Sequence, residues 1–234
     1  MFNPTVWSAV LGGLPRYAID DPSKTALVVV DMQYLDAHPD YGIGKKLKER
    51  GTFHLVEGYF DRVKDATAVI AKLLDACRET GVEVIYITIA SRTQDGRERS
   101  RVHRDNDLHA QIGSREAAVL DEIAPQGDEI VLHKTAGGVF NSTEIDYLLH
   151  NLGIETVIMT GVVTNGCVET AVRDAADRSY KVILVPDACA AFTDELHENA
   201  LKSVGEKICN LRTSEEVLAE LAVLPRRAAV AAMA

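Results

Sequence analysis

The sequence lacks several features that would assign it to particular classes of protein. Its four cysteines, Cys77, Cys167, Cys189 and Cys209, are scattered and form no CxxC pair. This pattern is typical of a reducing compartment and argues against a disulfide scaffold or a zinc site. No run reaches the roughly 18 apolar residues of a membrane span, and the first residues lack the positive start of a secretory signal. We therefore expect a cytoplasmic protein.

The chain has fewer basic than acidic residues, and it lacks a glycine-rich phosphate-binding turn after the first predicted strand. The chain has 25 Lys and Arg residues against 35 Asp and Glu residues, which gives a formal net charge of -10. This charge repels nucleic acid phosphates and anionic membranes, and no basic stripe opposes it. The segment DMQYLD, residues 31–36, stands where a dinucleotide-binding domain would have GxGxxG. We expect no nucleic acid, no membrane and no dinucleotide cofactor as partner.

No Pro-, Gly- or Ser-rich linker divides the 234 residues. We therefore predict a single domain over residues 1–234, with an N-terminal extension at 1–24 and a flexible tail at 223–234.

Short runs rich in Val and Ile alternate with amphipathic helical patterns. The runs span residues 25–31, 82–90, 129–134, 155–161 and 181–187, with a weaker one at 207–213. The helical patterns cover residues 61–80, 114–123, 142–152, 166–179, 194–204 and 214–222. This alternation predicts an α/β fold with three layers, α/β/α, around a mainly parallel six-stranded sheet. Two long polar connections, residues 32–60 and 91–113, leave the carboxyl ends of strands, where ligands bind in such sheets.

Three residues with complementary chemistry are predicted at that same edge. Asp31 ends the first strand, Lys134 ends the third, and Cys167 follows the fourth at the start of a helix. A helix N-terminus lowers the pKa of a thiol, a carboxylate accepts its proton, and a lysine keeps that carboxylate ionised. By itself Cys167 is equally explained as a packed thiol, and the other cysteines are interpreted as structural. Because the three residues are predicted to converge at one edge of the sheet, we favour a catalytic role for Cys167 over a packing role.

Three segments carry a resemblance to a known family. VVVDMQ, HKTAGGVFNST and GVVTNGCVETAVRDAADRSYKVILVPDACA, spread over residues 25–190, resemble the signature blocks of the isochorismatase-like cysteine hydrolases. The resemblance implies a catalytic triad of Asp31, Lys134 and Cys167. It also implies neighbouring first and fourth strands at a switch in strand order, a cis peptide bond between Val162 and Val163, and an oxyanion hole formed by the N–H groups of Val163 and Cys167.

The resemblance also indicates an activity. It implies a cysteine-dependent amidohydrolase that cleaves a C–N bond of a small linear amide or ureido compound, such as ureidoacrylate, biuret or an N-carbamoyl amino acid, through a thioester. The family's nicotinamidases carry an Asp-x-His metal motif that is missing from residues 91–105. We therefore interpret His103 and His109 as loop histidines and predict no metal and no other cofactor. Alternatives that stay open are a nicotinamidase-type hydrolase, an isochorismate-type hydrolase and a non-catalytic metabolite-binding member. A homo-oligomer, dimer or tetramer, is expected by resemblance.

Candidate substrate contacts lie next to the triad in sequence. Arg92 is a candidate clamp for a substrate carboxylate, although it equally fits a solvated or interfacial charge cluster with Asp95, Glu98 and Asp105. Gln33 and Tyr34 are alternatively surface residues at a helix start, and Phe140 is alternatively a core residue. The full set of candidates is Gln33, Tyr34, Arg92, Phe140, Asn141, Thr164 and Asn165.

Overall fold

A computed structural model describes residues 9–10, 12–205 and 207–226 of the chain. Its centre is a six-stranded sheet in the order β3-β2-β1-β4-β5-β6, and every neighbouring pair is parallel. The predicted parallel sheet is thus confirmed. The strands are β1 (Thr25–Val30), β2 (Glu83–Ile89), β3 (Ile130–Lys134), β4 (Thr156–Val162), β5 (Lys181–Ala190) and β6 (Asn210–Leu211).

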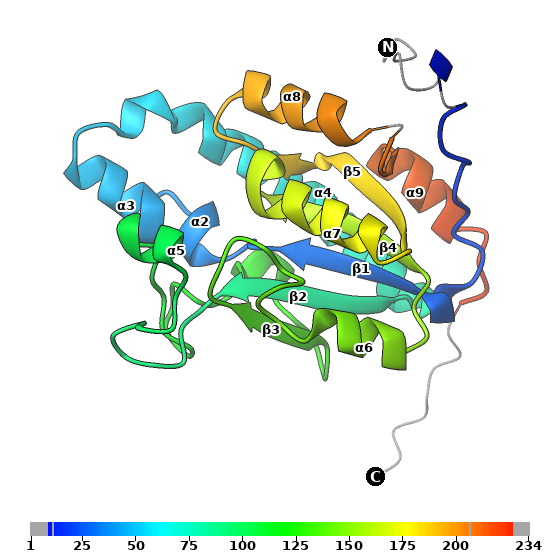
Figure 1. Ribbon diagram of the computed structural model, residues 1–234, viewed down its shortest axis with the longest axis horizontal. Helices are drawn as coiled ribbons and strands as arrows, with labels where there is room; N and C mark the ends of the chain where they lie inside the picture. Colours follow the sequence, from blue (N-terminus) through cyan, green and yellow to red (C-terminus); the bar gives the residue numbers. More distant parts are fainter. Residues whose placement is uncertain (1–8, 11, 206, 227–234) are drawn as a thin grey trace.

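Helices cover both faces of this sheet, as predicted. Figure 1 shows α6, α7 and α8 in front of the sheet and α4 behind it. No helix among the described residues is long and apolar enough to cross a bilayer. The helices are α2 (Tyr34–Ala37), α3 (Gly42–Glu49), α4 (Glu57–Thr80), α5 (Arg101–Asp105), α6 (Ile145–Asn151), α7 (Glu169–Asp177), α8 (Asp194–Val204) and α9 (Ser214–Leu221).

The central strand β1 is buried along its whole length. Because successive side chains of a strand point to opposite faces, Leu27 and Val29 pack in the core cluster that includes the apolar side of α4. Ala26 and Val28 pack in the second cluster, with side chains of α6, α7 and α8. A strand that is apolar on both faces needs helices on both sides, which explains the three layers.

The order of strands reverses between β1 and β4. From β1 the chain builds β2 and β3 on one side, and then crosses to place β4 on the other side of β1. The carboxyl ends of β1 and β4 therefore meet at the switch point, as the resemblance implied. The long polar connections contain the short helices α2, α3 and α5, which gather beyond this edge of the sheet (Figure 1).

The helix predicted over residues 114–123 is wrong. There the backbone pairs with the segment after β1, since Tyr34 N–H donates to Ala118 O at 3.0 Å and Leu120 N–H donates to Met32 O at 3.0 Å. Only Asp121–Ile123 forms a short 3₁₀ turn. Carbonyl and amide groups that pair with another segment are not available for the bonds of an α-helix.

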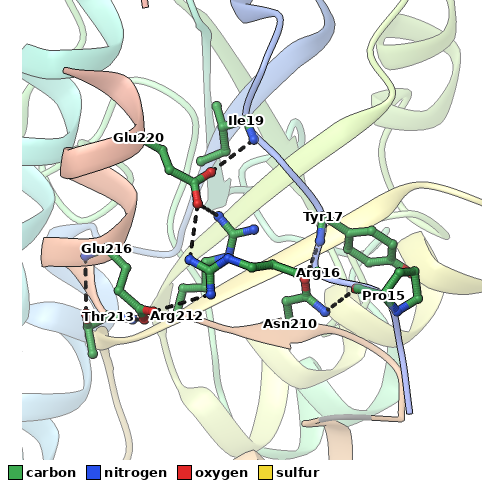
Figure 2. Close-up of polar contacts among 9 residues, drawn as sticks. All are labelled: Pro15, Arg16, Tyr17, Ile19, Asn210, Arg212, Thr213, Glu216 and Glu220. Atoms are coloured by element: carbon green, nitrogen blue, oxygen red, sulfur yellow. Dashed lines mark hydrogen bonds and ion pairs between the residues drawn. The ribbon is translucent and has the colours of Figure 1, made fainter. Parts of the chain in front are cut away.

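The N-terminal segment before β1 is fixed to the last helix. Figure 2 shows Glu220 of α9 between Arg212, Arg16 and the Ile19 N–H group, at 2.8, 3.1 and 3.1 Å. Residues 15–19 of the predicted extension are therefore held against the domain. The predicted flexible tail lies partly outside the described residues, which end at 226, and within them Arg226 pairs with Glu79 at 3.5 Å.

At Gly161, β4 leaves no room for a side chain against β1. It has a φ of +110°, and a Cβ atom at this position would lie 2.0 Å from Val30 O. We expect Gly161→Ala to destabilise the protein by roughly 3 kcal/mol, because the clash adds to the cost of the backbone conformation. That corresponds to a melting temperature lower by about 10 °C in thermal unfolding.

A matched control is Gly153→Ala. Gly153 has a φ of +71°, and a Cβ atom there would meet no described atom within 4 Å. This variant should lose only about 1 kcal/mol. Equal melting temperatures for the two variants would show that the close approach does not constrain the sheet.

Candidate active site

Asp31 occupies the first position after β1 and has a left-handed backbone, with a φ of 53°. Its N–H group still donates to Ile87 O of β2 at 2.8 Å, and its carbonyl accepts from Gln33 N–H at 2.8 Å. Aspartate tolerates this conformation better than most residues, and such outliers cluster at functional sites. The chain therefore turns sharply at the sheet edge and leaves the carboxyl group there.

The three predicted side chains meet at this edge. Lys134 Nζ lies 3.0 Å from Asp31 Oδ2 and donates to Cys167 Sγ at 3.3 Å. A further bond from Nζ to Ala136 O, at 3.1 Å, fixes the ammonium group. The Asp31 and Lys134 side chains are 2% and 0% exposed, whereas Cys167 is partly accessible. Cys77, Cys189 and Cys209 are buried, in keeping with structural roles.

The charges of the three groups depend on one another. Burial raises the pKa of Asp31, and Lys134 and Cys167 only partly oppose it. Burial and the Asp31 charge raise the pKa of Cys167, and Lys134 opposes them less strongly. For Lys134 burial favours the neutral amine, but Asp31 and Cys167 outweigh it and raise the pKa. The pKa values of all three groups are therefore raised, and each depends on the charges of the other two.

This result corrects one expectation from the sequence. A position at a helix start was expected to lower the pKa of Cys167, but in this arrangement the pKa is raised. The prediction is wrong because burial and the adjacent carboxylate outweigh the lysine. The thiol therefore needs a base during the reaction, and Asp31 is the carboxylate beside it.

The backbone before Cys167 has the geometry that the resemblance implied. The peptide bond between Val162 and Val163 is cis, which confirms that expectation. Residues Thr164–Val168 then form a distorted helical turn that leads into α7, and Gly166 N–H donates to Val163 O at 2.9 Å. This turn brings Val163 and Cys167 into one short segment, as an oxyanion hole built from their N–H groups requires.

Gln33 and Tyr34, both predicted substrate contacts, have other partners. The Gln33 side chain is fully buried, accepts from Ile89 N–H, and donates to Ile89 O and Glu116 O at 3.0 and 2.9 Å. Both N–H groups of the Gln33 amide are therefore used, so a bond donated by Gln33 to a substrate would have to replace a backbone contact. Tyr34 lies under Arg115, whose guanidinium is 3.7 Å from the ring centre.

Tyr34 belongs to a separate cavity of about 590 Å³. Its ring packs on His38 and Tyr41, with ring centres 5.0 and 5.1 Å apart. The cavity is lined by Tyr34, His38, Asp40, Tyr41, Lys45, Arg115 and Glu116. None of the three triad residues lines it.

The remaining predicted contacts differ in accessibility. Arg92 is exposed, and its charge lowers the pKa of His133, next to Lys134, although burial lowers it more.

Phe140 is buried in the core with its ring centre 6.2 Å from that of Tyr180, while Asn141 is exposed. Thr164 is buried and its hydroxyl hydrogen-bonds His197 Nδ1 at 2.8 Å, while Asn165 is exposed. Arg92, Asn141 and Asn165 are thus the accessible members of the set.

Two buried residues whose pKa values respond to the charges of triad residues were missed by the sequence interpretation. Asp36 lies on α2, and burial and the Asp31 charge raise its pKa to about 8. His103, interpreted as a loop histidine, is 3% exposed, and burial and the Lys134 charge lower its pKa to about 4. Asp36 Oδ2 and His103 Nδ1 make no hydrogen bond within the described part of the chain. No motif marks either residue, because both lie in the long polar connections.

Comparisons with known proteins agree with this fold. The family model described as Isochorismatase domain matches residues 25–216. Ureidoacrylate amidohydrolase RutB of Agrobacterium fabrum is 32% identical over 189 residues, which cover 71% of this chain and 76% of that protein. A cysteine hydrolase from Pseudomonas syringae pv. phaseolicola has a TM-score of 0.74 at 29% sequence identity. The superposition covers 88% of this chain and 96% of the hydrolase chain. N-carbamoylsarcosine amidase from Thermoplasma acidophilum has a TM-score of 0.65 at 28% identity, with coverages of 82% and 97%.

Proposed function

This chain belongs to the isochorismatase family and is a hydrolase, and from this premise we propose that it cleaves the C–N bond of a small linear amide or ureido compound through a thioester on Cys167. One observation carries the proposal, namely the contact of Lys134 with both Asp31 and Cys167. It places a base, a cation and a thiol at one point, which is what covalent acyl transfer requires. Relatives named for ureidoacrylate and N-carbamoylsarcosine support the substrate class.

In the proposed reaction Asp31 transfers protons in both halves of the cycle, first as the thioester forms and again as it is hydrolysed. Asp31 accepts the thiol proton while Cys167 Sγ attacks the carbonyl carbon, and the Val163 and Cys167 N–H groups bind the resulting oxyanion. Asp31 then donates its proton to the nitrogen, so the C–N bond breaks and ammonia or an amine leaves. A water molecule loses a proton to Asp31 and attacks the thioester carbonyl. The C–S bond then breaks and Asp31 returns the proton to the sulfur, which releases a carboxylic or carbamic acid and restores both the thiol and the ionised Asp31. Lys134 keeps its charge throughout and balances the negative charge of Asp31 or the sulfur.

The test is ammonia release from a panel of compounds. The panel contains ureidoacrylate, biuret, N-carbamoyl amino acids, simple amides and nicotinamide, each with the native protein and with Cys167→Ser. We expect release from a linear ureido or amide compound and none from the variant. Preference for nicotinamide would favour a nicotinamidase, and no release from any compound would favour an isochorismate-type hydrolase or a non-catalytic protein.

The pH dependence of kcat/KM provides a further prediction. The proposed reactive form has Asp31 ionised beside charged Lys134 and protonated Cys167, so activity should be lost as pH falls and Asp31 takes up a proton. Since the pKa of Asp31 is raised, this loss should occur at a pH above the ordinary aspartate value of about 4. The measurement is kcat/KM from pH 4 to 8, with circular dichroism to confirm folding. Full activity down to pH 4 would contradict the assignment of Asp31 as the base.

A further inference from the structure

A histidine on α8 holds the turn that carries Cys167. Helix α8 packs against this turn, and the Nδ1 atom of His197 is hydrogen-bonded to the Thr164 hydroxyl at 2.8 Å. Thr164 is 1% exposed and stands in the chain between Val163 and Cys167, whose N–H groups are assigned to the oxyanion hole. The proposed mechanism gives His197 no role.

The turn Thr164–Val168 is not a regular helix. Asn165 has φ -85° and ψ 16°, and Gly166 has φ -134° and ψ -106°. The N–H groups of Gly166 and Val168 both donate to Val163 O, at 2.9 and 3.4 Å. A regular helix fixes the direction of its N–H groups by its own repeating bonds, whereas an irregular turn depends on the structure packed around it. A contact from α8 therefore helps to set where the N–H groups of this turn point.

Helix α8 is itself anchored where it begins. From α4, Arg62 donates to Ala191 O and Phe192 O at 3.3 and 2.7 Å, and it pairs with Asp194 at 3.2 Å. His197 lies one turn further along α8. Burial lowers its pKa, so the ring is neutral near pH 7. A neutral imidazole and a hydroxyl can each donate or accept, so the bond forms with either tautomer.

We propose that His197 is a positioning residue, which acts through Thr164 to hold the N–H groups of Val163 and Cys167 in the direction of the developing oxyanion. This inference rests on the proposed function and adds a residue to it. His197 transfers no proton in this role. A displacement of about 1 Å in a reacting geometry can cost on the order of 100-fold in rate, so one fixed contact has a large effect.

The test removes the bond from each side and measures ammonia release from the panel compound that the native protein cleaves fastest. His197→Leu and Thr164→Val should each lower kcat about 10- to 100-fold and change KM less than about threefold, because the oxyanion forms only after attack. The double variant should lose no more than either single variant, since both changes remove the same bond. His197→Asn places an amide atom where the ring has Nδ1, and Thr164→Ser keeps the hydroxyl, so each should retain about half of the native kcat or more.

A reagent without a carbonyl group separates the oxyanion hole from the thiol itself. Methyl methanethiosulfonate transfers its CH₃S group to the sulfur of Cys167, which forms an S–S bond and releases methanesulfinate, and no oxyanion develops. The rate at Cys167, followed by mass spectrometry of its peptide, should stay within about twofold of native in His197→Leu and Thr164→Val. A matched control is Val204→Ala, which truncates a buried apolar side chain of α8 and should lower the melting temperature with kcat unchanged.

Four results would overturn the inference. They are native kcat in His197→Leu, an equal loss in His197→Asn, losses that add in the double variant, and a rate of thiol modification that falls in parallel with kcat. A loss of kcat in Val204→Ala as large as that in His197→Leu would also overturn it, because the effect would then follow from the stability of α8. Failure of the proposed function is recognised separately, from a native protein that is inactive on the whole panel or from undiminished turnover in Cys167→Ser, and the inference would fall with it.

Discussion

Cys167→Ser is expected to reduce kcat/KM by at least about 1,000-fold and to leave the fold intact. Serine retains the size of the side chain, but its hydroxyl is a far weaker acid than a thiol, and Asp31 is too weak a base to activate it. The hydrogen bond from Lys134, 3.3 Å long in this structure, is preserved by an oxygen acceptor. The measurement is ammonia release at saturating and limiting substrate, alongside a thermal melt.

The matched control is Cys77→Ala. Cys77 is a buried thiol near the end of α4, and its carbonyl accepts from Val82 N–H just before β2 begins, so it lies at the opposite edge of the sheet from the triad. We expect some loss of stability with an unchanged kcat. If Cys167→Ser kept more than about a tenth of the native activity, Cys167 would not be the nucleophile.

Asp31→Asn should lower both activity and stability. Without the carboxylate the thiol has no base, so turnover should fall about 100- to 10,000-fold. The substitution also leaves the fully buried Lys134 charge without its ion pair, at a cost of roughly 3 kcal/mol. The melting temperature should drop by about 10 °C, measured by circular dichroism beside the ammonia assay.

A double variant separates these two effects. Asp31→Asn with Lys134→Met removes both buried charges, so most of the lost stability should return while turnover stays low. If the double variant melted as low as Asp31→Asn, the unpaired lysine would not explain the loss. If Asp31→Asn alone kept native turnover, another group would have to be the base.

The sequence predicted the parts of the site that the sheet itself positions. Asp31 and Lys134 end apolar runs, and Cys167 follows one, so the parallel topology alone brings them to one edge. The neighbouring positions of β1 and β4 bring Asp31 and Cys167 together, and the long Lys134 side chain reaches both from β3, two strands away from β1. Helices with long apolar stripes, such as α4, were also predictable, because burial of one face enforces the periodicity.

Other features of the fold and the site depend on tertiary packing, which the spacing of apolar residues along the sequence does not encode. The segment 114–123 carries helix-like apolar spacing, but its backbone is paired with the residues after β1. Asp36 and His103 belong to helices of four and five residues, which are too short for a periodic signal. Burial also reversed the expected direction of the Cys167 pKa shift, and the extent of burial is a property of the folded chain.

The most direct test of the central claim is detection of the thioester. Native protein is mixed with an active compound from the panel, quenched in acid within milliseconds to seconds, digested and analysed by mass spectrometry. We expect an acyl or carbamoyl adduct on the peptide that contains Cys167, removable by hydroxylamine and missing from Cys167→Ser. Ammonia release with an adduct on another residue, or with undiminished turnover in Cys167→Ser, would contradict the account.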